Sequence, residues 1–188
     1  MDQIFRVGHS TRPEWSDAVH HCLEQIGTVD GFNLGFLYVV EPFGQVLDLI
    51  LETLQSETGI LSWAGASAMG VLANNVEYFN RNAIAIMVTC LPETSFETFK
   101  ETFAVDKHFA VVHADSRRPD IVRHIRELSN AQDSFLVGGL TMPESRRVND
   151  RSVADWASTG VAFTEKVAVQ TGVTQGCTPI GPIHVITE

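Results

Sequence analysis

Cysteine is scarce in this 188-residue chain, and its three thiols lie far apart. An odd number of distant cysteines argues against a disulfide framework or a zinc site and suits a reducing cytoplasm. Basic residues are also few, with 13 Lys and Arg against 23 Asp and Glu and a net charge of −10. The pairs Arg117-Arg118 and Arg146-Arg147 are short and fit solvated faces. Because an acidic surface repels phosphate backbones, we expect no nucleic-acid partner.

Long hydrophobic runs are absent as well. No apolar segment approaches the ~20 residues that a membrane helix needs. The N-terminus, Met1-Asp2-Gln3, lacks the basic-then-apolar pattern of a secretion signal. We therefore expect a cytoplasmic protein with no membrane partner. With 44% hydrophobic residues, the chain fits one domain that covers residues 1–188.

Three amphipathic helices are predicted from apolar residues at helical spacing. The first follows Thr11, which forms a T-x-x-E capping box with Glu14, and Cys22 lies on its buried stripe. The second carries its apolar face over residues 46–54, and the third begins near Pro119. Four residues of the third helix are expected to face inward: Ile121, Val122, Ile125 and Leu128.

Apolar, β-branched runs between the helices predict strands. They cover residues 34–40, 60–64, 83–89, 109–114, 135–138, 161–163, 167–173 and 184–187. Most do not alternate with polar residues, so both faces of the sheets are expected to be covered. Residues 164–166 are predicted to form a hairpin turn between the two strands that flank them. Residues 96–103 carry Phe at helical spacing and fit a short helix or a loop.

The order strand, helix, strand occurs twice, and in each unit the second strand ends in small residues. These segments are Gly65-Ala66-Ser67 and Gly138-Gly139-Leu140-Thr141. Open sheets bind ligands at strand ends, so we expect the two segments to meet around one cleft. The predicted fold is α/β, with helices packed on mixed sheets and two similar strand–helix–strand units. A layered α-β-β-α arrangement is one form that it can take.

A third informative segment runs Gln-Gly-Cys-Thr-Pro-Ile-Gly-Pro over residues 175–182. Its glycines permit close approach of a ligand, and its prolines fix the backbone. The loop is either a tight turn before a last strand or one wall of a binding site. Successive backbone N–H groups in such a turn suit a carboxylate. The predicted ligand-binding residues are Gly65, Ala66, Ser67, Gly139, Thr141, Gln175, Gly176, Cys177 and Gly181.

Together, these three segments resemble the recurring motifs of the FIST N-terminal domain family, named for F-box and intracellular signal transduction proteins. The resemblance covers roughly residues 31–187, and the Gln-Gly-Cys-x-Pro-Ile-Gly-Pro run is its most specific part. The family often has cysteine where this chain has Ala66. The resemblance implies a sensory domain that binds a small molecule, such as an amino acid or related carboxylate, without a cofactor. It also implies a FIST C-terminal domain as the partner in the parent protein.

Enzymatic readings find less support. The chain has no G-x-S-x-G, no G-x-G-x-x-G and no P-loop motif. The alternative from another class is a cysteine-dependent hydrolase or transferase that uses Cys177, with His9, His113 or His184 as base. A pure interaction module is a third reading. His113 and Asp115 lack a third metal ligand at matching spacing, so a local hydrogen bond or a cap of the following helix by Asp115 is expected instead. We expect a binding domain with no catalytic residue and no metal site.

Overall fold

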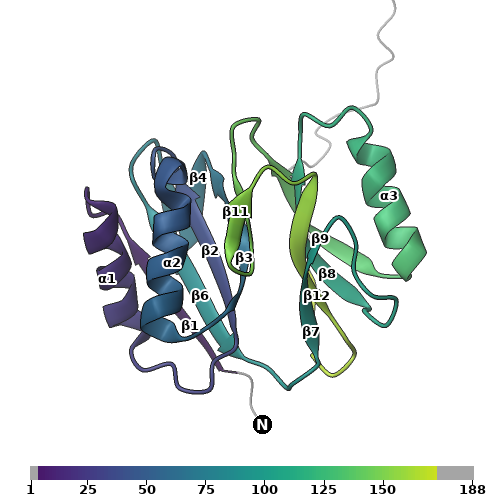
Figure 1. Ribbon diagram of the computed structural model, residues 1–188, viewed down its shortest axis with the longest axis horizontal. Coiled ribbons are helices and arrows are strands. Elements are labelled where there is room, and N and C mark those ends of the chain that lie inside the picture. The colour runs from purple at the N-terminus through teal and green to yellow at the C-terminus, as the bar shows by residue number, and fades with distance from the viewer. Residues whose placement is uncertain (1–3, 173–188) are drawn as a thin grey trace, which may run out of the picture.

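The computed structural model describes residues 4–172, which form an α/β fold with three α-helices on mixed sheets (Figure 1). The first sheet has six strands in the order β1-β6-β2-β3-β10-β11, and the second has four in the order β7-β12-β8-β9. The first sheet contains β1 (Ile4–Ser10), β6 (Ile84–Cys90), β2 (Leu34–Val40), β3 (Ser62–Ala68), β10 (Arg147–Asn149) and β11 (Ser152–Ala154). The second contains β7 (Phe96–Lys100), β12 (Ser158–Phe163), β8 (Phe109–Asp115) and β9 (Phe135–Thr141). A separate hairpin pairs β4 (Gly70–Ala73) with β5 (Val76–Phe79). The predicted fold class is confirmed.

Apolar side chains join the helices to the sheets and the sheets to each other. Helices α1 (Trp15–Ile26) and α2 (Leu47–Thr58), the latter preceded by the 3-10 turn η1 (Phe43–Val46), pack on the first sheet. Helix α3 (Ile121–Gln132) packs on the second sheet. Figure 1 shows α1 and α2 at one side of the molecule and α3 at the other. A further buried cluster contains residues of both sheets: Leu34, Phe36, Ala64, Phe109, Val161 and Phe163.

The helices follow the predicted pattern except at two points. Cys22 is buried in α1 as expected, and burial raises the pKa of its thiol to about 12. The predicted capping box is wrong, because α1 begins after Glu14, whose side chain makes no capping hydrogen bond. Val122 is 62% exposed rather than buried. At 3.6 residues per turn, Val122 is rotated about 100° from Ile121 and leaves the narrow face that Leu128 shares with Ile121.

The two halves of the fold repeat one pattern. Strands β2 and β3 are parallel and joined through α2, while β8 and β9 are parallel and joined through α3. All four strands have seven residues, and both helices have 12. An antiparallel strand flanks each pair, β6 beside β2 and β12 beside β8. The two strand–helix–strand units predicted from the sequence therefore correspond element by element.

One glycine occupies the same place in each unit. Gly65 and Gly138 are the fourth residues of β3 and β9, with φ of 152° and 138°. A Cβ atom would lie 1.8 Å from the Leu37 carbonyl oxygen at the first position and 1.9 Å from that of Val112 at the second. Both glycines are thus required by close backbone contact between parallel strands.

Two predictions near the second sheet are wrong. The chain leaves β12 at Phe163 in a turn, where the Val167 N–H donates to the Thr164 carbonyl oxygen at 3.0 Å. Residues 167–172 form no strand, so the hairpin predicted at 164–166 is not formed. The Thr164 N–H instead donates to the Ser95 carbonyl oxygen at 2.8 Å, which directs the chain toward the start of β7. The predicted strand at 184–187 lies outside the described residues.

The segment expected to be a short helix or a loop contains strand β7, which pairs with β12. Phe96 packs with the cluster that joins the sheets, and Phe99 packs with the cluster under α3. A spacing of three residues puts side chains on opposite faces of a strand. Because both faces of this sheet are covered by apolar groups, a strand can bury phenylalanines on both faces. The helical spacing of these residues is therefore also compatible with a strand.

Candidate functional site

A cleft of about 570 Å³ lies at the carboxyl halves of the matched parallel strands. It brings together four of the predicted site residues, Ala66 and Ser67 from β3 and Gly139 and Thr141 from β9. The fifth from these strands, Gly65, lies within β3 and does not line the cleft. The remaining lining residues come from both units and the β4–β5 hairpin: Tyr38, Ala68, Met69, Gly70, Val71, Leu72, Glu77, Phe79, Val111, His113, Gly138, Leu140 and Met142.

The polar groups of Ser67 and Thr141 already have protein partners. The Ser67 N–H donates to the Arg146 carbonyl oxygen at 3.0 Å, and the Arg146 N–H donates to Ser67 Oγ at 3.1 Å. Thr141 Oγ1 donates to the Ala114 carbonyl oxygen at 3.1 Å and accepts from Arg147 Nη1 at 2.7 Å. These bonds hold the cleft walls in place, with the Thr141 hydroxyl already used as a donor and Ser67 Oγ used as an acceptor.

Tyr38 and His113 meet in this cleft from the two units. The Tyr38 hydroxyl lies 2.8 Å from Nε2 of His113, and the ring centroids are 5.4 Å apart. Burial raises the pKa of Tyr38 to about 12. Burial, and secondarily the positive charge of Arg147, lower the pKa of His113 from 6.5 to about 4. At neutral pH both side chains are therefore uncharged, and their hydrogen bond joins β2 to β8.

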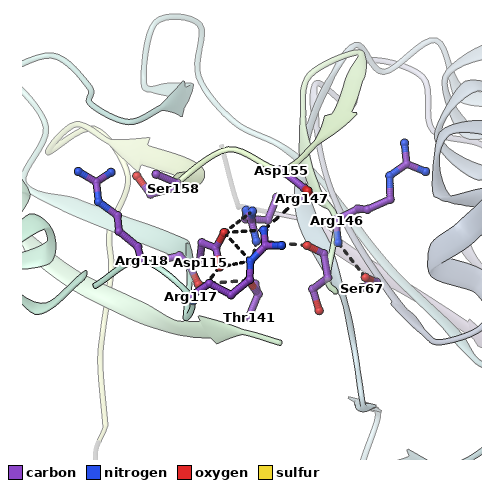
Figure 2. Close-up of polar contacts among 12 residues, drawn as sticks. Ser67, Asp115, Arg117, Arg118, Thr141, Arg146, Arg147, Asp155 and Ser158 are labelled. Atoms are coloured by element: carbon purple, nitrogen blue, oxygen red, sulfur yellow. Dashed lines mark hydrogen bonds and ion pairs between the residues drawn. The ribbon is translucent and has the colours of Figure 1, made fainter. Parts of the chain in front are cut away.

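Arg147 is the most deeply buried charge near the cleft, with no solvent exposure of its side chain. Its Nη1 donates to the Ser145 carbonyl oxygen at 3.2 Å as well as to Thr141, and its Nη2 lies 3.5 Å from Oδ2 of Asp115. Burial is the main cause that lowers the pKa of Arg147. Figure 2 shows Arg147 directed toward Asp115, while the side chain of Arg146 points away. The solvated face suggested for this arginine pair is thus wrong for Arg147.

Asp115 is held chiefly by another arginine. Arg117 donates from Nη2 to Oδ2 at 2.7 Å and from Nε to Oδ1 at 3.0 Å (Figure 2). These bonds hold the pKa of Asp115 below its usual value. The expected local hydrogen bond is confirmed, since the Arg117 N–H donates to Oδ1 of Asp115 at 2.9 Å. Asp115 does not cap α3, because Asp120 stands at that position. Asp115 therefore has two cationic neighbours, and Arg147 is the buried one.

A comparison with models of protein families identifies the family of this chain. The model of the FIST N domain matches residues 33–188. The chain belongs to the FIST N domain family. Membership is consistent with a sensory domain of a signalling protein. A comparison with curated proteins gives no significant match.

The most specific motif of this FIST N domain falls on residues that the structure does not describe. Gln175, Gly176, Cys177 and Gly181 lie outside residues 4–172, so their part in the cleft stays a prediction. Within the described range, no three His, Cys, Asp or Glu side chains form a group that fits a metal ion. The helices of that same range include none long and apolar enough to cross a membrane.

Several cleft residues of the FIST N domain escaped the sequence analysis. Tyr38 sits in an apolar strand, where nothing distinguishes a lining residue from a core residue. Leu72 and Phe79 sit in the four-residue strands β4 and β5, which are too short to give a clear pattern. Arg147 was read only as half of a basic pair. One usable signal did exist for Tyr38, since aligning the first strands of the two units, Leu34 with Phe109, places it opposite His113.

Proposed function

We propose that this FIST N domain is the small-molecule-binding sensory domain of a signalling protein, and that its ligand is an amino acid or related carboxylate. The observation that carries the proposal is the meeting of matched strand ends from two units in one cleft, which Ser67 and Thr141 both line. Open sheets commonly bind ligands at such ends. The cleft volume of about 570 Å³ falls within the range of small-molecule sites.

Positive charge supports an anionic ligand. Arg147 is excluded from water and bonded to Thr141, which lines the cleft. Its field already disfavours protonation of His113, another lining residue. In a medium of low dielectric constant, such a charge acts over a longer distance than it does in water. A carboxylate near Thr141 would gain from the same field.

Backbone groups of β9 offer further hydrogen bonds, since the Thr141 hydroxyl already donates to the Ala114 carbonyl oxygen. Strand β9 is the edge of the second sheet among residues 4–172, so its outer side has no neighbouring strand there. Residues 138–142 also line the cleft. Unpaired N–H groups along an edge are available to a ligand. The loop at residues 175–182 is proposed to add further donors of this kind.

The proposal assigns binding, and no catalytic step, to this domain. A FIST C-terminal domain is the proposed partner in the parent protein, and no nucleic acid or membrane is involved. Of the three candidate bases for Cys177, His113 is poorly suited to act as a general base, which supports a binding role for the cleft. Its Nε2 is bonded to Tyr38, and a pKa of about 4 makes its imidazole a weak base.

The experiment is a thermal-shift screen of the purified protein against amino acids and organic acids. A ligand present at a hundredfold its Kd should stabilise the folded state by about 2.7 kcal/mol. The test variant is Gly139→Val, because no atom lies within 4 Å of a Cβ placed there and valine suits a strand. It should fold normally and lose the ligand-induced shift.

Ser152→Val is the matched control, since it puts the same side chain on an exposed position of β11 outside the cleft. This variant should keep the full shift. Equal shifts in the wild type and in Gly139→Val would place the ligand elsewhere and defeat the proposed site.

A further inference from the structure

A second space, here called the apolar chamber, adjoins the cleft. Its volume is about 370 Å³. It is bordered by strands of the first sheet, the β4–β5 hairpin and β8, and it is partly open to solvent. Nearly all of its lining side chains are apolar: Val7, Phe36, Tyr38, Leu72, Ala73, Asn74, Ala85, Ile86, Met87 and Val111. Such a lining favours a hydrocarbon group over a charged one.

The chamber and the cleft share walls. Tyr38, Leu72 and Val111 line both spaces. Tyr38 presents its hydroxyl to His113, while Phe36, two residues earlier on the same face of β2, lines only the chamber. The two spaces therefore adjoin at these side chains, and the lining changes from polar at Ser67 and Thr141 to apolar beyond Tyr38.

Large apolar side chains stand exposed around the cleft. Leu72 is 72% exposed, Met69 is 54% exposed and Phe79 is 49% exposed, and all three line the cleft. Three exposed apolar side chains on one concave surface indicate a binding site for an apolar group. A ligand with a hydrocarbon part would remove them from water.

We propose that the ligand is an amphipathic carboxylate whose unbranched or branched apolar chain occupies the apolar chamber while its carboxylate lies in the cleft. This inference rests on the proposed function and adds the class of ligand. The shared chemistry is a carboxylate with a hydrocarbon chain of several carbons. It is present both in amino acids with large apolar side chains and in simple carboxylic acids.

Isothermal titration calorimetry with two series of ligands tests the inference. One series is alanine, norvaline and 2-aminooctanoate, and the other is propionate, valerate and octanoate. Each buried methylene should tighten binding by about fourfold, which is the ratio that corresponds to 0.8 kcal/mol. The series with the lower Kd at equal chain length shows whether the amino group is recognised.

Leu72→Glu is the test variant, because its exposed side chain can be changed without disturbing the core. The variant should abolish the increase in affinity with ligand chain length, because its carboxylate would stand in the wall between the chamber and the cleft. Val122→Glu, a change at another well-exposed apolar residue, on α3, should leave the gain in affinity with chain length intact. Urea unfolding of both variants confirms that each is folded.

The outcomes separate the two proposals. Short and long chains that bind with equal affinity would overturn the amphipathic ligand and leave a carboxylate site in the cleft. The amphipathic ligand would also be overturned if Leu72→Glu keeps the full increase in affinity with chain length. If no member of either series binds, the proposed carboxylate function itself fails, and this inference fails with it.

Discussion

Tyr38 and His113 are the fifth residues of β2 and β8, and the Tyr38 hydroxyl lies 2.8 Å from Nε2 of His113. The two side chains thus hold the same position in the two units and meet each other. Neither is charged at neutral pH, because burial raises the pKa of Tyr38 and lowers that of His113. The contact ties together the strands whose ends form the cleft.

Removing the Tyr38 hydroxyl should destabilise the fold. Tyr38→Phe leaves the buried Nε2 of His113 without its partner, and an unsatisfied buried group costs about 1–3 kcal/mol. The free energy of unfolding in urea measures the loss. The control is Tyr78→Phe, which removes the hydroxyl from the half-buried His9–Tyr78 pair, where water can replace it. Equal losses in both variants would contradict the role given to burial.

Acid should destabilise the protein through His113. The unfolded chain takes up a proton near pH 6.5, but the folded protein resists it until about pH 4. Between these values the unfolded state binds more protons, so stability falls as the pH decreases. About 3 kcal/mol should be lost across this window at 1.36 kcal/mol per pKa unit.

Urea unfolding at several pH values measures this loss. His113→Gln cannot titrate and should lose less stability between pH 6.5 and 4 than the wild type does. The exposed His20→Gln should keep the wild-type dependence. A parallel pH profile for wild type and His113→Gln would refute the assignment.

The charge of Arg147 should be visible in the titration of His113. Arg147→Met removes a positive charge that helps to lower that pKa, so the pKa should rise. It should stay below 6.5, because burial is the larger cause. NMR titration of the imidazole signals gives the value. Arg146→Met is the control, since the Arg146 side chain points away from the buried network (Figure 2).

The paired glycines should tolerate no side chain. Gly65→Ala and Gly138→Ala would each force a Cβ against a carbonyl oxygen at a positive φ, and we expect a loss of about 3 kcal/mol or more. Gly139→Ala adds the same methyl group in open space and should change stability by less than ~1 kcal/mol. Chemical denaturation compares the three. A mild effect at either paired glycine would show that the strands can separate locally.

Cys177→Ser separates binding from catalysis. If the thiol only lines the site, the variant should keep the fold and most of the ligand affinity, because serine is nearly isosteric. Calorimetry with the ligand found in the screen measures this. A hydrolytic or transferase activity that disappears in Cys177→Ser, while binding survives, would instead support the cysteine-dependent enzyme.

The sequence predicted the repeated units because their strands are continuous apolar runs. Residues 34–40 match β2 without error. It did not predict β1, in which exposed Ile4 and Phe5 precede a buried end, or the three-residue strands β10 and β11. Short strands carry too few side chains for a pattern, and their pairing is decided by neighbours distant in sequence.

The cleft was predictable in part. Small residues at equivalent strand ends pointed to Ser67 and Thr141, and both line it. The partners of these residues were not predictable, because the Arg146 backbone bonds to Ser67 across 79 residues, and the Arg147–Thr141 bond depends on the burial of an arginine. Charge alone indicated a surface position for Arg147. Only the surrounding structure shows that a strand carries it into the interior.

The matched units have a consequence for how a ligand lies. Two identical halves would accept a molecule in either of two opposed orientations with equal energy. Here, Ser67 in β3 stands where β9 has Leu140, and Ala68 stands where β9 has Thr141. The divergence of these strand ends gives the site a direction. We therefore expect an unsymmetrical ligand to bind in one orientation, with each of its ends in a particular half of the site.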